Sequence, residues 1–113
     1  PANLRLHRGL LSMTRDPRQS AKIGSDADRL LWVGRTHTLL VESPRIPGED
    51  YPDQQSSAEV YTNPDPKAYV ELETLGPLRV LKVGDTLSQT NTYTLGRRTL
   101  SDPEAEARRI LRR

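Results

Sequence analysis

The alternation of apolar and polar positions is clearest between Tyr69 and Pro77. An extended strand here would carry on one face Tyr69, Glu71, Glu73 and Leu75, and on the other Val70, Leu72 and Thr74. The second face is apolar enough to pack on a core, and Pro77 would end the pairing because proline cannot donate to a strand ladder. The first face places a tyrosine ring beside two glutamates, which repel each other, so partial burial would raise the pKa of at least one. A solvated edge strand with two surface glutamates is the alternative interpretation.

Similar runs predict antiparallel strands around this one. Residues 29–43 are the most strand-like run and predict a hairpin with its bend at Gly34-Arg35. Residues 58–62 alternate as well, and the turn-forming residues 63–66 would make them an antiparallel neighbour of the strand at 69–75. We therefore expect an all-β fold, an antiparallel β-sandwich.

The remaining segments carry shorter signals. Residues 4–11 favour a short strand, and residues 22–26 favour a loop in which Gly24 allows a positive φ. Residues 44–57 predict a long loop, which is usually functional or disordered in a compact domain. Residues 78–96 are expected to hold two strands around a Gly-Asp turn.

Residues 101–113 predict a C-terminal α-helix. Ser101 is the expected N-cap, and Glu104 would complete a capping box with it. The arginines near the end of the segment suit the negative end of the helix dipole. An acidic first half and a short apolar stripe favour a solvated helix that caps the fold, with a basic helix contacting nucleic acid or a membrane as the alternative.

The composition changes the expected domain organisation. The 113 residues suffice for one domain, yet only 34% are apolar, 4% are aromatic and none is Phe. The sequence also begins with Pro1. We therefore expect a C-terminal piece of a larger domain, with strands over about residues 29–96 and the helix over about 101–113. A single small domain that dimerises is the alternative, and in both cases uncovered β faces favour self-association.

The charge pattern narrows the function classes. The 17 basic and 15 acidic residues are mixed along the chain and leave a net charge of +2, which does not indicate a nucleic-acid surface. No cysteine is present for disulfide or thiolate chemistry, and no apolar run is long enough to span a bilayer. Nucleotide loops, nucleophile elbows and metal-binding motifs are also missing from the sequence, so we expect no cofactor, no metal, no nucleic-acid partner and no membrane partner.

One polar-aromatic patch results if the strands at 58–62 and 69–75 align their polar faces. Its members would be Glu59, Tyr61, Tyr69, Glu71 and Glu73. Carboxylates that accept hydroxyl groups, beside rings that can stack, are suited to a carbohydrate. Because like charges facing across strands destabilise a sheet, the patch needs an intervening Lys or Arg, shared protons, or a register that separates the acids. Lys22 could reach a carboxylate or a sugar hydroxyl, with an ordinary surface lysine as the alternative, and Lys22 or an arginine is the expected partner of Glu71. Tyr51 and Asp53 would lie at the rim, or alternatively form only a proline-stiffened turn.

Two further side chains invite a functional interpretation. Trp32, the only tryptophan, could stack on a pyranose ring, but its apolar neighbours favour a place in the core. His37 alternates with threonines and has no second His, Cys or carboxylate at metal-ligand spacing, so we expect a structural or solvated histidine.

The order of several motifs resembles the C-terminal end of the galactose mutarotase-like (aldose 1-epimerase-like) β-supersandwich family. The matching parts are Leu72-Glu73-Thr74, the apolar segment 78–81, the turn Lys82-Val83-Gly84-Asp85 and the strand 87–95. An uncharacterised bacterial branch, catalogued as a domain of unknown function, is more similar still. It adds Lys22-Ile23-Gly24, Tyr51-Pro52-Asp53, the motif at 59–63 and the full motif at 71–77, so that the resemblance covers about residues 20–98.

The resemblance implies a carbohydrate-binding domain with a sugar held on one sheet face. It places Glu73 at the family's general base, so we expect Glu73, more than Glu71, to be partly buried at the floor of a concave site. It also implies that substrate is bound by Tyr69, Glu71, Glu59, Tyr61, Asp53 and Lys22. The family's catalytic histidine lies further upstream of the glutamate than this chain extends, so neither His7 nor His37 takes that role. The alternatives are an aldose 1-epimerase-type isomerase with Glu73 as its base, and a structural or interaction β-domain without a ligand.

Overall fold

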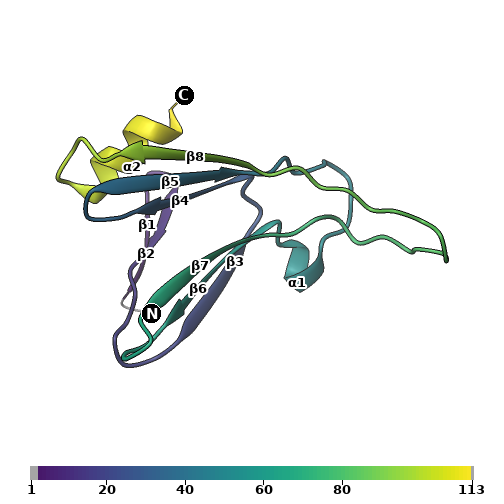
Figure 1. Ribbon diagram of the computed structural model, residues 1–113, viewed down its shortest axis with the longest axis horizontal. Helices are drawn as coiled ribbons and strands as arrows, with labels where there is room; N and C mark the ends of the chain where they lie inside the picture. The colour runs from purple at the N-terminus through teal and green to yellow at the C-terminus, as the bar shows by residue number, and fades with distance from the viewer. Residues whose placement is uncertain (1–2, 113) are drawn as a thin grey trace.

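The computed structural model describes residues 3–112 and consists mainly of antiparallel strands, with a helix near the C-terminus (Figure 1). In chain order the elements are β1 (Leu4–His7), β2 (Leu10–Met13), β3 (Ala21–Ser25), β4 (Arg29–Val33), β5 (His37–Glu42), α1 (Pro52–Gln55), β6 (Ala58–Asn63), β7 (Tyr69–Thr74), β8 (Thr92–Arg97) and α2 (Pro103–Leu111). Two three-stranded sheets have the orders β3-β6-β7 and β4-β5-β8, and β1 and β2 form a separate hairpin. The predicted all-β antiparallel fold with a C-terminal helix is confirmed.

A small core lies where the inner faces of the two sheets meet. Leu30 and Val41 face each other in the β4–β5 ladder, and Ala58 at the start of β6 packs against them. Partly buried side chains surround this centre, namely Ala27, Leu39, Val60 and Leu72. The period-two alternation of β7 therefore turns Leu72 toward the core, as the sequence predicts.

The predicted hairpin at 29–43 is confirmed as β4 and β5, but the place of Trp32 is not the expected one. Trp32 keeps 41% of its surface exposed instead of entering the core. Its ring folds over the turn, where a Cβ atom on Gly34 would come within 2.1 Å of it. The turn is closed by the Gly34 N–H, which donates to the carbonyl of His37 at 2.8 Å. Glycine is required here because the tryptophan ring occupies the space of a side chain.

The segment 22–26 is largely a strand, so the predicted loop is wrong. Residues Ala21–Ser25 pair with β6 along their whole length, and Gly24 lies opposite Glu59. Gly24 is not among the residues with positive φ. A Cβ at this position would meet the Oγ of Ser56 at 2.3 Å, so the glycine serves the close approach of the following loop.

The long loop at 44–57 is ordered by a left-handed turn. Asp53, Gln54 and Gln55 have φ values of 52°, 59° and 68°. The turn is fixed at both ends, since the Tyr51 N–H donates to the side-chain oxygen of Gln55 and the Ser56 hydroxyl donates to the Asp53 carbonyl. Tyr51 itself is buried with 3% exposure. The loop is thus fixed by its own hydrogen bonds, and it holds Asp53 at one end of β3.

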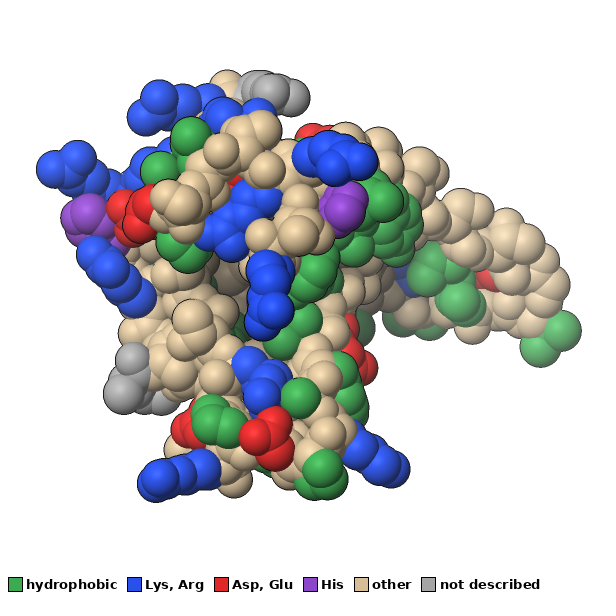
Figure 2. All heavy atoms as spheres, turned by 60° about the vertical axis from the view of Figure 1, so that its left-hand side comes forward, with side chains coloured by type: hydrophobic (Ala, Val, Ile, Leu, Met, Phe, Trp, Pro, Cys, Tyr) green, Lys and Arg blue, Asp and Glu red, His purple; other side chains and the backbone are tan. Residues whose placement is uncertain are grey.

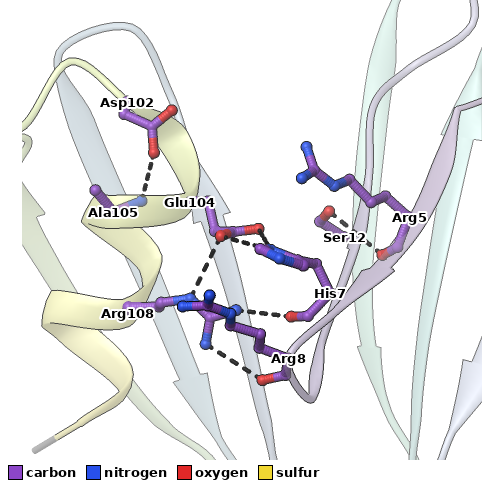
Figure 3. A network of polar contacts seen from close by, with 8 residues as sticks. All are labelled: Arg5, His7, Arg8, Ser12, Asp102, Glu104, Ala105 and Arg108. Carbon is purple, nitrogen blue, oxygen red and sulfur yellow. Dashed lines mark hydrogen bonds and ion pairs between the residues drawn. The ribbon is translucent and has the colours of Figure 1, made fainter.

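The N-terminal segment is a hairpin that docks on α2 (Figure 3). Glu104 accepts from the His7 ring, and this hydrogen bond is the main reason why the pKa of Glu104 is lowered. Arg108 donates to the carbonyls of His7 at 2.7 Å and Arg8 at 3.3 Å. The positive φ of Arg8, followed by Gly9, makes the tight turn between β1 and β2.

The predicted helix is confirmed as α2, but its predicted N-cap is wrong. Asp102, one residue later than Ser101, accepts from the Ala105 N–H at 2.8 Å. Glu104 turns toward His7 and does not complete a capping box. The Ser101 carbonyl instead accepts a hydrogen bond from the Arg98 side chain.

Residues 78–91 contain no strand, so half of the prediction for 78–96 is wrong. Only Thr92–Arg97 pairs, with β5, and the expected strand start at Leu87 is not observed. The preceding residues form an extended arm that leaves the body after β7 and returns to β8 (Figure 1). Val80 and Val83 on this arm are 97% and 108% exposed, so no packing supports a strand there.

Candidate functional site

The register of the β3-β6-β7 sheet gathers the predicted patch on one face. Glu59 lies between Gly24 and Glu73, and Tyr61 lies between Lys22 and Glu71. Asn63 and Tyr69 form the next pair along the same face. Because pairing partners in antiparallel strands point to the same side, these side chains share the face opposite the core.

Lys22 is the cation that this acidic face requires. Its ammonium lies 3.0 Å from Oε2 of Glu59 and 3.1 Å from Oε2 of Glu73. These two carboxylates, Glu59 first, raise the pKa of the Lys22 ammonium above its ordinary value. We expected Lys22 or an arginine to pair with Glu71, and this expectation is wrong for Lys22, because Glu71 is exposed and the lysine bridges the other two acids.

The most buried acid of the face is Glu59. Its exposure is 3%, whereas the side chain of Glu73 is 33% exposed. Glu73 is more buried than Glu71, as expected, but it does not form the floor of a hollow. The neighbouring Asp53 carboxyl raises the pKa of Glu59, and burial adds to the shift while Lys22 opposes it. Within the described residues, Oε1 of Glu59 has no hydrogen-bond partner.

Beside Glu59 lies a hollow of about 660 Å³, which we call the β3–α1 hollow. It is lined by one side of β3, the α1 turn and the start of β6: Lys22, Ile23, Gly24, Ser25, Asp26, Arg45, Asp53, Gln54, Gln55, Ser56 and Glu59. Three of the predicted residues, Lys22, Asp53 and Glu59, therefore meet at one place. Glu73 does not line the hollow, but it contacts Lys22, which does.

The predicted aromatic residues lie away from the hollow on the same sheet face. The rings of Tyr61 and Tyr69 are 5.9 Å apart and inclined at 46° to each other. The Tyr61 hydroxyl donates to the side chain of Asn63 at 2.8 Å. Tyr69 is 47% exposed and forms the outer edge of the pair. Tyr51, expected at the rim, is instead buried beneath the loop.

Sequence reasoning missed Arg45 and the polar α1 turn. The Arg45 guanidinium lies 4.3 Å from the centre of the Tyr51 ring and donates to the carbonyl of Gln55 at 2.9 Å. Arg45 also belongs to the lining of the hollow, so it adds a second positive charge to the wall. The only signal in the sequence was the unusual length of the loop, which is typical of functional loops.

The described residues were also compared with metal sites, membrane-spanning helices and known proteins. Within residues 3–112, no three His, Cys, Asp or Glu side chains are grouped so that they could hold a metal ion. Neither described helix has the length and apolar character needed to cross a membrane. Comparison with family models, curated proteins and solved structures found no match to this chain.

Proposed function

We propose that the β3–α1 hollow binds carbohydrate and that the chain acts as a carbohydrate-binding domain. The observation that carries the proposal is Glu59, a buried acid on the wall of the hollow with an Oε1 atom that has no partner among the described residues. Burying such an atom without a hydrogen bond destabilises a fold, and a hydroxyl donor from a ligand would relieve it. The Asp53 carboxyl also raises the pKa of Glu59, which favours the protonated form of this acid. A protonated carboxyl both donates and accepts hydrogen bonds, as a sugar hydroxyl does.

The rest of the wall supports a polyhydroxylated ligand. Lys22 and Arg45 supply charged donors, while Gln54 and Ser56 supply neutral donors and acceptors. A volume of about 660 Å³ falls in the range of small-molecule sites and suits one or two sugar rings. A glycan that continues along the sheet face would meet the Tyr61–Tyr69 ring pair, whose exposed face suits stacking.

The geometry favours a domain that binds carbohydrate without catalysing a reaction. An epimerase-type base must reach a substrate proton with a free, ionised carboxylate. Glu73 already accepts from Lys22, and the described wall of the hollow contains Glu59 instead. The epimerase alternative therefore has no specific contact in its favour.

The test is a glycan screen with the folded chain, followed by NMR titration of the best ligand. The expected result is a saturable shift of the amide signals of residues 22–26 and 53–59. Glu59→Gln should weaken binding by about tenfold, which corresponds to the loss of one good hydrogen bond to a charged group. The matched control is Glu42→Gln, a half-buried glutamate on β5 of the other sheet. The proposal is wrong if no glycan binds, or if both variants bind as tightly as the original chain.

A further inference from the structure

The arm at residues 76–91 is the largest feature that the hollow does not explain. It connects β7 to β8, and it has a preformed turn at its tip. There the Asp85 N–H donates to the Lys82 carbonyl at 2.9 Å, and the Asp85 carboxylate accepts from the Lys82 N–H at 2.8 Å. Gly84 supplies the φ of +94° that this turn needs. The turn is well defined although Val83 beside it is fully exposed, which indicates that the tip of the arm is built for a contact outside the chain.

The apolar residues of the arm point into solvent. Their exposed fractions are 58% for Leu78, 97% for Val80, 52% for Leu81, 108% for Val83 and 57% for Leu87. Apolar side chains are visible along the projecting arm and at its end, clear of the body (Figure 2). In a chain with only 34% apolar residues, so many exposed together mark an interaction surface.

The base of the arm is held by the loop that follows β5 and by the end of β7. The Leu78 N–H donates to the Asp50 carbonyl at 2.7 Å, and Arg79 pairs with Glu49 at 2.9 Å. On the returning leg, Gln89 donates to the Ser43 hydroxyl at 2.7 Å and Asn91 donates to the Thr74 hydroxyl at 2.9 Å. The arm is therefore directed away from its own body.

The same chain carries an uncovered apolar strand face. Tyr93 and Leu95 pair with Val41 and Leu39, so they share the core face of the sheet. They nevertheless remain 63% and 71% exposed, because the second sheet does not reach them. Within the described residues β8 pairs only with β5, which leaves its outer backbone edge free. Trp32 extends this apolar row at 41% exposure.

We infer that the arm of one copy docks on β8 of a second copy of this chain. The arm supplies apolar side chains and unpaired backbone, and β8 supplies an uncovered apolar face and a free edge that can accept an added strand. Both halves of the contact belong to one sequence, so two copies can satisfy each other in a symmetric pair. The net charge of +2 is too small to oppose association between copies.

The available area is large enough for such a pair. Eight exposed side chains, five on the arm together with Trp32, Tyr93 and Leu95, would each bury about 60 to 120 Å² of apolar surface. Their sum of about 500 to 1,000 Å² per copy spans the roughly 800 Å² that each partner contributes to a standard stable interface.

Sedimentation equilibrium from low to several hundred micromolar chain tests the inference. The original chain should form a dimer, and the double variant Val80→Glu with Val83→Glu should raise the dimer Kd by at least about tenfold. Both valines are fully exposed, so the variant should keep its circular dichroism spectrum and melting temperature. The matched control is Leu6→Glu, which changes a residue that is 73% exposed on β1 and should leave the dimer intact. A monomer at every concentration, or a dimer that tolerates the double variant, would overturn the inference.

A cross-linking experiment locates the contact. The chain has no cysteine, so each introduced thiol is unique. Val83→Cys protein mixed separately with Tyr93→Cys and Leu95→Cys protein should form mixed disulfides on oxidation, because a bridge requires the two Cα atoms to lie within about 7 Å. Mixing with Leu6→Cys protein is the control. Equal yields in all mixtures, or no cross-link to either β8 position, would contradict docking on β8. None of these residues lines the β3–α1 hollow, so this result is independent of carbohydrate binding.

Discussion

Glu59 and Glu73 lie directly opposite each other on β6 and β7, where two like charges would ordinarily destabilise the sheet. The pairing is tolerated because Lys22, on the other side of β6, reaches across and contacts Oε2 of both acids. One ammonium therefore holds three strands in register on this face. Asp53 is a second acid near Glu59. It raises the pKa of Glu59, whereas Lys22 lowers it.

Replacing Lys22 by methionine should destabilise the chain in a pH-dependent manner. Without the ammonium, the facing glutamates repel each other, so their pKa values in the folded chain rise above the unfolded values. Protons then bind more tightly to the folded state, and the loss of stability is greatest near neutral pH and shrinks as the pH falls toward about 4. We expect the melting temperature at pH 7 to fall by on the order of 5 °C. Lys67→Met, at an exposed lysine before β7, is the control and should change neither the melting temperature nor its pH dependence.

Glu106 makes the stability of the original chain depend on pH. It is completely buried and accepts from Arg109 and from both the N–H and the hydroxyl of Thr99. The Arg109 guanidinium, followed by the Thr99 N–H, lowers the pKa of Glu106 from 4.5 to about 2. A lowered pKa in the folded state stabilises the fold above the unfolded pKa, and this contribution is lost as the pH falls from about 4.5 toward 2.

Glu106→Gln should therefore lower the melting temperature at pH 7 and remove part of the acid-induced loss of stability. The amide still fills the space but cannot pair with the arginine charge. Thermal unfolding followed at pH 7, 4 and 2.5 would show the two melting curves converging as the pH falls. Glu71→Gln, at an exposed position on β7, provides the control. A constant difference between the variant and the original chain at all three pH values would contradict the assigned role.

How far the sequence could predict this structure depends on whether the signal was local. The alternation in 58–62 and 69–75 placed Glu59, Tyr61 and Glu73 on one face, and the structure confirms this arrangement. The turn residues between the two strands were sufficient to predict their pairing. The paired acids and the need for a cation followed from the same alternation.

Features set by side-chain packing, between near or distant residues, could not be predicted. Gly24 was interpreted as a loop glycine because its real constraint, the Ser56 hydroxyl, comes from a residue 32 positions later. Trp32 was expected in the core because nothing local showed that its ring folds over Gly34. The strand expected from Leu87 begins only at Thr92, where pairing with β5 starts, and Leu87 remains 57% exposed. Arg45 was not identified as part of the hollow because its position depends on stacking with Tyr51.

The N-cap of α2 offers a simple test of the local structure. Both Ser101 and Asp102 are good cap residues, but only Asp102 accepts from the Ala105 N–H. Asp102→Ala should therefore destabilise the chain by about 1 kcal/mol, measured by urea unfolding, whereas Ser101→Ala should change it by less than about 0.3 kcal/mol. A larger effect at Ser101 would restore the cap that the sequence predicts.

The last prediction separates the two glutamates that Lys22 joins. If Glu59 contacts the ligand and Glu73 only positions Lys22, their substitutions differ in size and in kind. Glu73→Gln leaves Lys22 paired with Glu59 at 3.0 Å, so carbohydrate binding should weaken by only about twofold to threefold, against about tenfold for Glu59→Gln. The two variants should also differ in pH dependence. The raised pKa of Glu59 makes binding by the original chain and by Glu73→Gln change as that acid ionises, whereas Glu59→Gln should bind with no such change.

NMR titrations of both variants at pH 5 and 7.5, with the glycan identified for the original chain, provide the measurement. Glu42→Gln serves again as the control on the other sheet. If Glu73→Gln abolishes binding while Glu59→Gln leaves it unchanged, the ligand contacts β7 and the assignment of the hollow is wrong. If Glu73→Gln instead removes an anomer-exchange activity and leaves binding intact, Glu73 acts as a base and the epimerase alternative replaces simple binding. Equal weakening in both variants would mean that Lys22 itself is the main ligand contact, because each acid then acts only by holding the ammonium in place.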